Sequence, residues 1–516
     1  MKQRSVFGLR FYSVVTGFLI VITSCSEVQM NNTGIFQDSG DVGECKIKGE
    51  TLYDSTEQVY HLSGSGQNIW DTLDQFHYTW IKLDGDFIVR SRVKFVGDGS
   101  HEHRKIGWMV RNSLDTGSPH VNGVVHGDGL TSLQFRKIPG GVTEEIKSPA
   151  TSPDIIQLER RANEYILSTA KFGETFTTVS TKEVHLEDSV FVGIFICSHD
   201  NEVLEQAVFS NVRIIKPAWE GLVQYRDYLG SRLEIMDVGT GHRKILFEAP
   251  NSIQAPNWAP LEDRLIYNCD GLLYSFSLES LKPEKINTGF ATSNNNDHSV
   301  SFDGKMLAIS NHVEEDNNNS IIFTLPVDGG TPERITEQGP SYLHGWSPDG
   351  TGLVFTGGRA GNYDIYKIDV KEKKEVRLTL EPGLDDGSEY SPDGKYIYFN
   401  SNRTGTMQIW RMDSDGMNPV QITHDEYNDW FPHISPDGKW IVFLSFMKEV
   451  DPGDHPFYRH VYLRLLPVSG EGEPRVIAYI YGGQGTINVA SWSPDSRNIA
   501  FVSNSGPVDV TEHTME

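Results

Sequence analysis

Short runs in which apolar and polar residues alternate fill much of the chain after residue 45. Residues 87–93, 105–111, 130–136 and 189–195 show the pattern, and Gly, Asp and Pro separate these runs. Alternation with a period of two is typical of strands that bury one face, and such short spacing is typical of two packed sheets. The pattern therefore predicts a two-sheet all-β sandwich over residues 45–217.

A turn motif recurs through the second half of the chain. Its copies are Ser-Pro-Asp-Gly at Ser347, Ser391 and Ser435 and variants at residues 258–263, 301–304 and 493–496. Counted from Ala259 and then from each Ser, the intervals are 42, 46, 44, 44 and 58 residues. A repeat in the forties that holds four short strands is typical of propeller blades. We therefore expect a six-bladed β-propeller over residues 218–508.

The motif also has the chemistry of a tight hairpin. Pro fixes φ, the Asp side chain can cap the turn, and Gly accepts positive φ. The last unit ends soon after residues 501–503 without outer strands, whereas strand-like runs at 233–237 and 243–247 precede the first unit. The two ends of this region are therefore expected to complete one blade between them.

These units resemble the TolB-like six-bladed propellers. Leu378-Thr379 and Ile422-Thr423 end their blades as that family does, and the resemblance covers residues 220 to 505. The family includes protein-interaction domains and the N-terminal domains of some peptidases. No peptidase domain is expected here, because no Gly-x-Ser-x-Gly nucleophile elbow is present.

The predicted sandwich resembles a concanavalin A-like jelly-roll family found in secreted carbohydrate-handling proteins. The resemblance lies in residues 68–76, 106–111 and 117–120, and it implies a fold and a setting but no reaction. Four aromatic side chains are candidates to stack on sugar faces, although core packing is the stronger reading for the last of them: Trp70, Phe76, Trp80 and Trp108. His101 and His103 have metal-capable side chains, but their spacing is more typical of a solvated turn.

The N-terminus has the pattern of an export signal. Lys2, Arg4 and Arg10 accompany an apolar run over residues 11–22, which is too short to span a bilayer. Ile-Thr-Ser-Cys then resembles a bacterial lipobox, which implies a signal peptide over 1–24 and acylation of Cys25. We expect a tether over 25–44, a tail over 509–516, and a lipid-anchored protein of the cell envelope, at the outer membrane on its periplasmic or surface side.

Three cysteines remain after Cys25. Cys45 and Cys197 lie near the two ends of the predicted sandwich, so a bridge between them is open, whereas Cys269 has the context of a buried strand. An odd number of cysteines in an exported protein excludes a framework in which every cysteine is paired.

Charge excludes one class of partner. Lys and Arg number 45 against 70 Asp and Glu, which gives a net charge of −25. Nucleic acid is bound mainly through cationic contacts to phosphates, so we expect no nucleic-acid partner.

Polar residues gather just before each turn motif, in the segments expected to lie beside the propeller axis. Groups converging there from separate blades suit general acid-base chemistry or a divalent metal, and they also suit plain capping of blade turns. The candidate catalytic residues are His298, His344, Asp386 and Glu389. The candidate substrate-binding residues are Trp346, Tyr342, Trp430, Asp297, Asp385, Asp454 and His455.

A more distant resemblance is to the oligogalacturonate lyase propellers, which hold a manganese ion at the axis with His and Gln. It implies a metal site, for Mn or Ca, built from His298, His344, His433 and Gln484. The chain departs from that pattern, because the lyases have seven blades and because Ile487 and Asn488 stand where further His ligands would be needed.

Two functions remain open on the sequence. In the first, a lipid-anchored envelope protein binds oligo- or polysaccharide at the axial face of the propeller; if it is an enzyme, it is a glycan lyase or hydrolase. In the second, the protein is a non-catalytic TolB-like scaffold that binds an envelope protein. The polar cluster favours the first, and the absence of a complete catalytic signature favours the second.

Overall fold

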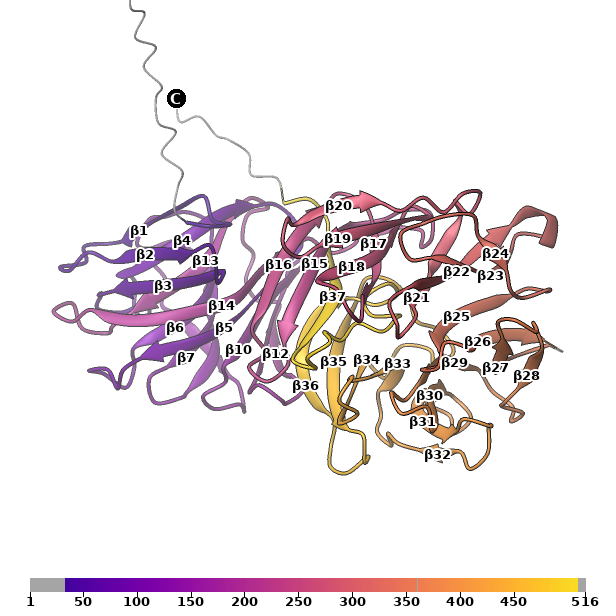
Figure 1. Ribbon diagram of the computed structural model, residues 1–516. Coiled ribbons are helices and arrows are strands. Elements are labelled where there is room, and N and C mark those ends of the chain that lie inside the picture. The colour runs from indigo at the N-terminus through magenta and orange to yellow at the C-terminus, as the bar shows by residue number, and fades with distance from the viewer. Residues whose placement is uncertain (1–32, 360, 509–516) are drawn as a thin grey trace, which may run out of the picture.

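The computed structural model describes residues 33–359 and 361–508, which form two β-rich domains side by side (Figure 1). One short 3₁₀ turn, η1 (Glu314–Asp316), is the sole helical element in this part of the chain. No helix among the described residues is long and apolar enough to cross a membrane. The expected signal peptide, Cys25 and the tail lie outside the described residues.

The first domain consists of two seven-stranded antiparallel sheets, ordered β1-β4-β13-β6-β7-β8-β9 and β12-β11-β10-β5-β14-β3-β2. The predicted two-sheet β-domain is therefore present, while the jelly-roll assignment stays a prediction. Its strands are β1 (Asp38–Val42), β2 (Glu50–Asp54), β3 (Val59–Gly64), β4 (Phe76–Leu83), β5 (Phe87–Val96), β6 (Lys105–Arg111), β7 (His120–His126), β8 (Thr131–Arg136), β9 (Glu144–Lys147), β10 (Ile155–Arg161), β11 (Glu164–Ala170), β12 (Thr177–Thr181), β13 (Val190–Cys197) and β14 (Glu205–Ile215).

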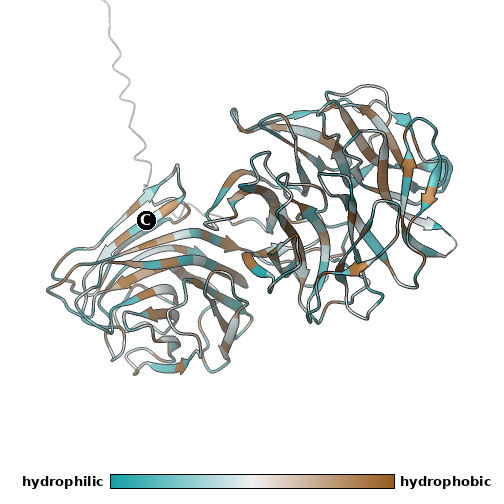
Figure 2. Ribbon diagram, turned by 60° about the horizontal axis from the view of Figure 1, so that its bottom comes forward, coloured by the Kyte–Doolittle hydropathy of each residue, from teal (hydrophilic) through white to brown (hydrophobic). Residues whose placement is uncertain are grey.

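The apolar positions of both sheets meet in one core, and hydrophobic segments run along the strands of both domains (Figure 2). Trp108 is buried there and its Nε1 donates to Ser91 Oγ at 2.9 Å. Phe76 is fully buried as well, so neither ring is available to a sugar. Trp70 remains 38% exposed. The core therefore accounts for two of the four aromatic candidates.

The sandwich begins earlier than expected, inside the segment assigned to the tether. β1 pairs with β4 from Asp38 to Val42. Phe36 is buried against Tyr60 and Trp108, with ring centroids 5.3 and 6.0 Å away. Strand pairing of β1, together with the buried side chains of Phe36 and Val42, therefore attaches residues 33–44 to the sandwich.

The second domain is the predicted six-bladed propeller. Five blades are four-stranded sheets in chain order, β17 to β20, β21 to β24, β25 to β28, β29 to β32 and β33 to β36. Their strands are β17 (Ile253–Trp258), β18 (Arg264–Cys269), β19 (Leu272–Ser277), β20 (Lys282–Lys285), β21 (Asn294–Val300), β22 (Met306–Val313), β23 (Asn319–Pro326), β24 (Glu333–Arg334), β25 (Ser341–Trp346), β26 (Gly352–Arg359), β27 (Asn362–Asp369), β28 (Glu375–Arg377), β29 (Asp385–Tyr390), β30 (Tyr396–Ser401), β31 (Gln408–Asp413), β32 (Val420–Gln421), β33 (Asn428–Ile434), β34 (Trp440–Phe446), β35 (Arg459–Pro467) and β36 (Arg475–Gly482).

The sixth blade is shared between the two ends of the propeller, as the sequence predicted. β37 (Asn498–Ser505) pairs along its full length with β15 (Gly230–Asp237), which pairs in turn with β16 (Arg243–Ala249). Residues 486–492 form the inner edge of this blade through backbone bonds to β37. In Figure 1, yellow β37 lies beside β15, so strand pairing closes the ring.

The repeated motif forms the expected turn. In the third blade, Ser347 Oγ donates to Asp349 Oδ1 at 2.6 Å, and the Gly352 amide donates to Ser347 Oγ at 2.8 Å. Gly350 has a φ of 71°, a conformation that costs Gly little. The last unit has Ser496 at the equivalent position with a φ of 61°. The backbone thus keeps one geometry where the sequence varies.

A buried charge network joins the two domains. Glu234 of β15 accepts hydrogen bonds from Arg213 of the sandwich at 2.6 Å and from Arg243 of β16 at 2.8 and 3.1 Å. Ser503 of β37 also donates to it at 2.5 Å. All four residues are buried. One carboxylate therefore links the sandwich, the first strands of the propeller and the last.

The cysteines within the described residues are free thiols. Cys45, Cys197 and Cys269 are all buried, and burial raises the pKa of Cys45 to about 12. The bridge left open between Cys45 and Cys197 is not formed. Packing and ion pairs hold the sandwich together instead, including buried Asp74 between Arg111 and Arg136.

Candidate functional site

The innermost strands of the blades surround the propeller axis. β17, β21, β25, β29 and β33 each shift register against the next strand, at residues 254–257, 294–298, 343–345, 386–389 and 430–433. Such bulges re-aim side chains and are common beside functional sites. The polar segments, which were expected beside the propeller axis, are the inner strands themselves and are largely buried.

An apolar pocket of about 190 Å³ opens at the end of the axis where the motif turns lie; we call it the axial pocket. Its wall consists of rings and prolines, namely Trp258, Phe302, Trp346, Tyr390, Trp492, Pro260, Pro392, Pro436 and Pro494. His344 and Glu389 also line it. The predicted substrate residue Trp346 therefore does line a pocket, with its Nε1 donating to the Ser299 carbonyl at 2.9 Å.

His344 and Asp386 form a buried pair behind this wall. His344 Nε2 lies 2.8 Å from Asp386 Oδ1, which also accepts a bond from Thr356 Oγ1 at 2.6 Å. Burial opposes both charges, yet their mutual attraction prevails, raising the pKa of His344 and lowering that of Asp386 to about 2. Burial raises the pKa of nearby Asp297 to about 7, opposed by His344 and reinforced by Asp386. The group combines an ion pair with a carboxyl that can carry a proton at neutral pH.

Glu389 and His433 form hydrogen bonds that join neighbouring blades. His433 Nδ1 lies 2.7 Å from Glu389 Oε2, and its Nε2 lies 2.5 Å from the Ile487 carbonyl. The other oxygen of Glu389 accepts the Ile434 amide at 3.0 Å. These bonds connect the fourth, fifth and sixth blades. The capping interpretation therefore describes this pair better than a catalytic one.

His298 and His344 occupy matching sequence positions but differ in their contacts. His298 Nε2 lies 3.0 Å from the carbonyl of Ile266 on the preceding blade, and burial lowers the pKa of His298 to about 4. It does not line the axial pocket. The bulge in β25 falls at residue 344 itself, whereas in β21 the register has recovered at residue 298. The bulges of β21 and β25 therefore end at different positions relative to the turn motif. As a result, the His298 and His344 side chains contact different parts of the propeller.

The four side chains expected to hold a metal do not form a ligand set. Both ring nitrogens of His433 have partners, and Gln484 Oε1 accepts Asn488 Nδ2 at 2.8 Å. Among the described residues, no group of three or more His, Cys, Asp and Glu side chains is placed to hold a metal ion. The residues present therefore do not fit the manganese site that the lyase resemblance implied.

Three further substrate-binding candidates, Trp430, His455 and Asp385, contact other side chains of the propeller. Trp430 is fully buried in the fifth blade, and its ring packs against His455 with centroids 4.6 Å apart. Asp385 is buried and pairs with Arg403 Nη2 at 2.8 Å. These contacts stabilise inner strands and leave neither Trp430 nor Asp385 free for a ligand.

Tyr342 and Asp454 belong to the other end of the axis, away from the motif turns. Burial raises the pKa of Tyr342 to about 12, with added effects of Tyr363, Asp297, Asp386 and Tyr225. Tyr225 lies in the segment between the domains and packs on Phe457 with ring centroids 5.2 Å apart. Burial, reinforced by the nearby Asp454 carboxylate, raises the pKa of Tyr225 to about 12. This end is therefore bordered by the interdomain segment.

Sequence reasoning missed most of the pocket wall. Trp258, Tyr390 and Trp492 stand immediately before the first residue of their motif units, as Trp346 does. The position immediately before each motif unit is the end of an inner strand and lies at the pocket rim. The recurrence of a bulky residue at this position was therefore a sequence signal for the pocket wall. Thr356, the second partner of Asp386, had no sequence signal.

Comparison with known proteins identifies the propeller. The family described as PD40, the TolB beta propeller domain, matches residues 344–451. An uncharacterized protein of Agrobacterium fabrum is 45% identical over 273 residues, which are 53% of this chain and 92% of that protein. The chain belongs to the TolB-like β-propeller family. A solved structure described as a putative TolB from Agrobacterium tumefaciens agrees, with 44% identity, a TM-score of 0.52, and coverage of 55% of this TolB-like chain and 100% of the other.

Two more distant solved structures match less well. TolB from Acinetobacter baumannii is 19% identical with a TM-score of 0.40, over 50% of this chain and 65% of that one. An oligogalacturonate lyase in complex with manganese is 15% identical with a TM-score of 0.37, over 54% of this chain and 84% of that one. Neither match bears on what this TolB-like protein binds.

Proposed function

We propose that this TolB-like protein is a non-catalytic binding protein of the cell envelope, and that its axial pocket takes an apolar segment of a partner protein. The observation that carries the proposal is the composition of the pocket wall, in which aromatic rings and prolines outnumber the polar residues Asn257, Ser299, His344 and Glu389. Burying apolar side chains against such a wall is favourable, whereas each sugar hydroxyl buried there would need a hydrogen-bond partner.

The side chains proposed for catalysis also favour binding over glycan cleavage. Glu389 and His433 satisfy each other and neighbouring backbone groups, and His298 contacts a backbone carbonyl. A general acid or base must reach the proton it transfers. Of the four catalytic candidates, Glu389 and His344 line the pocket. Glu389 is held by His433 and the Ile434 amide, and His344 is held in an ion pair with Asp386.

The proposed location rests on the N-terminal sequence. The export signal and the lipobox at Cys25 support a lipid anchor in the cell envelope, on the periplasmic or surface side of the outer membrane. The anchor would be the protein's contact with the membrane, and a protein would be its partner.

A site-specific photo-crosslink in cells tests the partner class. Phe302, at the pocket rim, is 39% exposed, so benzoylphenylalanine at this position points at a bound partner. Val376 on the outer strand β28 is 40% exposed and is the matched control. We expect one crosslinked envelope protein from position 302 and none from position 376.

Two results would contradict the proposal. Equal crosslinking from both positions would show that contact with the propeller is unspecific. Loss of the crosslink when envelope oligosaccharide is added, together with direct binding of that sugar to the purified protein, would favour the glycan-binding function instead.

A further inference from the structure

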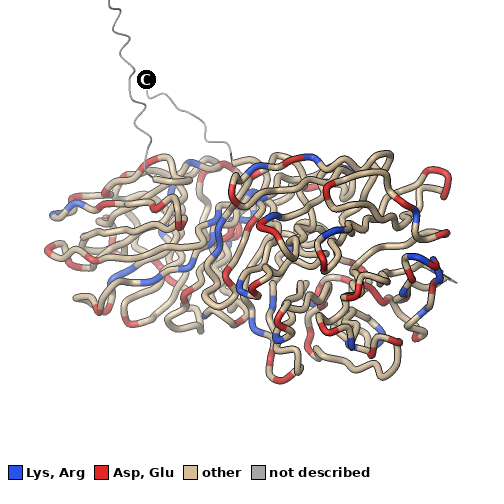
Figure 3. The backbone as a smooth tube through the Cα atoms, viewed as in Figure 1, with Lys and Arg blue, Asp and Glu red and all other residues tan. Residues whose placement is uncertain are grey.

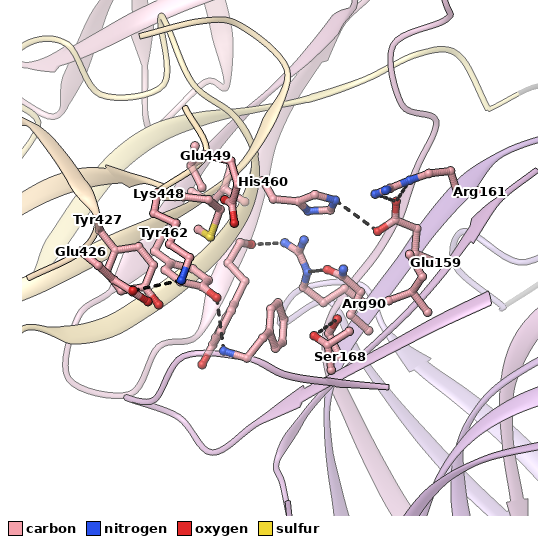
Figure 4. Close-up of a pocket in the computed structure, with 18 residues that line it drawn as sticks. Arg90, Glu159, Arg161, Ser168, Glu426, Tyr427, Lys448, Glu449, His460 and Tyr462 are labelled. Atoms are coloured by element: carbon pink, nitrogen blue, oxygen red, sulfur yellow. Dashed lines mark hydrogen bonds and ion pairs between the residues drawn. The ribbon is translucent and has the colours of Figure 1, made fainter. Parts of the chain in front are cut away.

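A cleft of about 330 Å³ lies where the sandwich meets the fifth blade (Figure 4). One wall comes from strands β5, β10, β11 and β12 of the sandwich. The other comes from β35 and β36 and from the segments around Tyr427 and Lys448 of the propeller. The cleft is separate from the axial pocket, and the two share no lining residue.

Arg90 lies in this cleft with an unpaired charge. It is 4% exposed; its Nε donates to Gln157 Oε1 at 2.8 Å and its Nη1 donates to the Tyr479 carbonyl. Arg243 donates to the same carbonyl at 3.1 Å, and burial together with Arg243 lowers the pKa of Arg90 to about 9. Within the described residues, no carboxylate lies within 4.0 Å of Arg90 and its Nη2 has no partner. Glu159 and Glu234 lie close enough to favour the Arg90 charge, but neither forms an ion pair with it. A buried charge without a direct ion pair is costly, so this geometry favours a bound anion.

The other charges around the cleft are largely neutralised. Glu159 pairs with Arg161 at 2.8 Å and with His460 at 3.2 Å across the domain boundary. Lys448 pairs with Glu426 at 3.1 Å. Acidic residues are spread over both domains, and several basic segments lie at their junction (Figure 3). Glu449 also lines the cleft, outside these pairs. Arg90 is the buried cation of the cleft that has no ion pair among the described residues, and it lies beside His460 and Glu159 in Figure 4.

Aromatic rings provide the second recognition element. Phe176 and Tyr479 lie with centroids 4.4 Å apart, and Tyr462 lies 5.5 Å from Tyr479. The hydroxyl of Tyr462 accepts the Phe176 amide and that of Tyr479 donates to the Glu174 carbonyl. Tyr462 and Tyr479 are buried, whereas Phe176 is half-buried. The ring surface open to the cleft therefore comes mainly from Phe176, with the two tyrosines packed behind it.

We propose that the interdomain cleft binds a small ring compound that bears a carboxylate. The carboxylate takes the free Nη2 of Arg90, and the ring packs on the aromatic group of Phe176, Tyr462 and Tyr479. Such a ligand contacts both domains at once. Two sources share this chemistry, a sugar acid and an aromatic acid, and the experiment separates them.

Calorimetric titration of the purified protein tests the charge and the ring together. The probes are glucuronate, benzoate, and glucose as the uncharged match of the first. We expect one of the two acids to bind in the cleft. If that acid is glucuronate, glucose should bind at least 10-fold more weakly. Binding of glucuronate alone identifies a sugar acid, and binding of benzoate alone identifies an aromatic acid. Failure of both acids to bind, or binding of glucuronate that glucose matches in affinity, would overturn the proposal.

Three variants locate the binding. Arg90→Gln should reduce acid affinity at least 10-fold. Thr178 lines the cleft, so Thr178→Trp should fill it and abolish binding without removing any bond of Arg90. Ser180 lies two residues further on the same face of β12 but outside the cleft, so Ser180→Trp should bind as the native protein does. Acid binding that survives Thr178→Trp, or that is lost equally in Ser180→Trp, would overturn the assignment even if Arg90→Gln does not fold.

Discussion

Glu234 offers the sharpest test of how the domains are held together. Glu234→Gln keeps the size of the side chain but removes the charge between Arg213 and Arg243. Two buried guanidinium groups would then lack a counter-ion, and four hydrogen bonds to the carboxylate would weaken. Breaking a buried pair in this way costs about 3 to 5 kcal/mol. We expect a loss of this size in the free energy of unfolding, measured by urea titration at pH 7.

Low pH should reduce the difference in the free energy of unfolding between the native protein and Glu234→Gln. Burial disfavours the Glu234 carboxylate, but Arg213 and Arg243 prevail and hold its pKa well below the usual 4.5. A lowered folded-state pKa gives stability that is complete above about pH 4.5 and declines as the pH falls further. The gap between native protein and Glu234→Gln should therefore be constant from pH 6 to 8 and shrink below pH 4.5.

An exposed ion pair of the neighbouring strand provides the control. Glu248 pairs with Arg232 at 2.7 Å, but its side chain is 63% exposed. Exposed pairs contribute about 0 to 1 kcal/mol, so Glu248→Gln should change little. A loss below 1 kcal/mol in Glu234→Gln, or equal losses in the two variants, would refute the idea that this carboxylate links the domains.

Three further changes test single features. His433→Ala removes the bonds to Glu389 and Ile487 and should cost about 3 kcal/mol in urea unfolding; an unchanged midpoint would contradict the blade-bridging role. Burial raises the pKa of folded Asp297 from 3.8 to about 7, so ionising this carboxyl destabilises the native protein as the pH rises from 4 to 7. Asp297→Asn should therefore become more stable than the native protein over this range, by up to about 4 kcal/mol. A pH-independent difference in melting temperature between the two proteins would oppose this. Gly350→Ala meets no atom within 4 Å but keeps a φ of 71°, so it should lose about 1 kcal/mol in melting experiments; no loss would mean the turn relaxes.

The repeat made the propeller predictable, whereas the bulges made the site hard to predict. Six turn motifs and the unmatched strands before the first of them were enough to predict six blades and a shared closing blade. The same symmetry predicted one role for His298 and His344, and the structure gives them two, because the register of an inner strand shifts at different residues in each blade. Arg90 had no sequence signal, since its surroundings come from a domain far along the chain.

The shared blade also sets the order in which the chain can fold. Glu234 and Ser503, bonded to each other, are 269 residues apart, and β37 is the last strand of the propeller. During synthesis, β15 and β16 are therefore made before β37, the strand that pairs with β15, and β37 follows only after the other five blades have been made. The sandwich can fold at once beside them, and its contacts with β16 keep these early strands near the place where β37 arrives. Strand edges exposed in this interval are prone to pair wrongly, so the contacts that hold β16 against the sandwich matter most before β37 has formed.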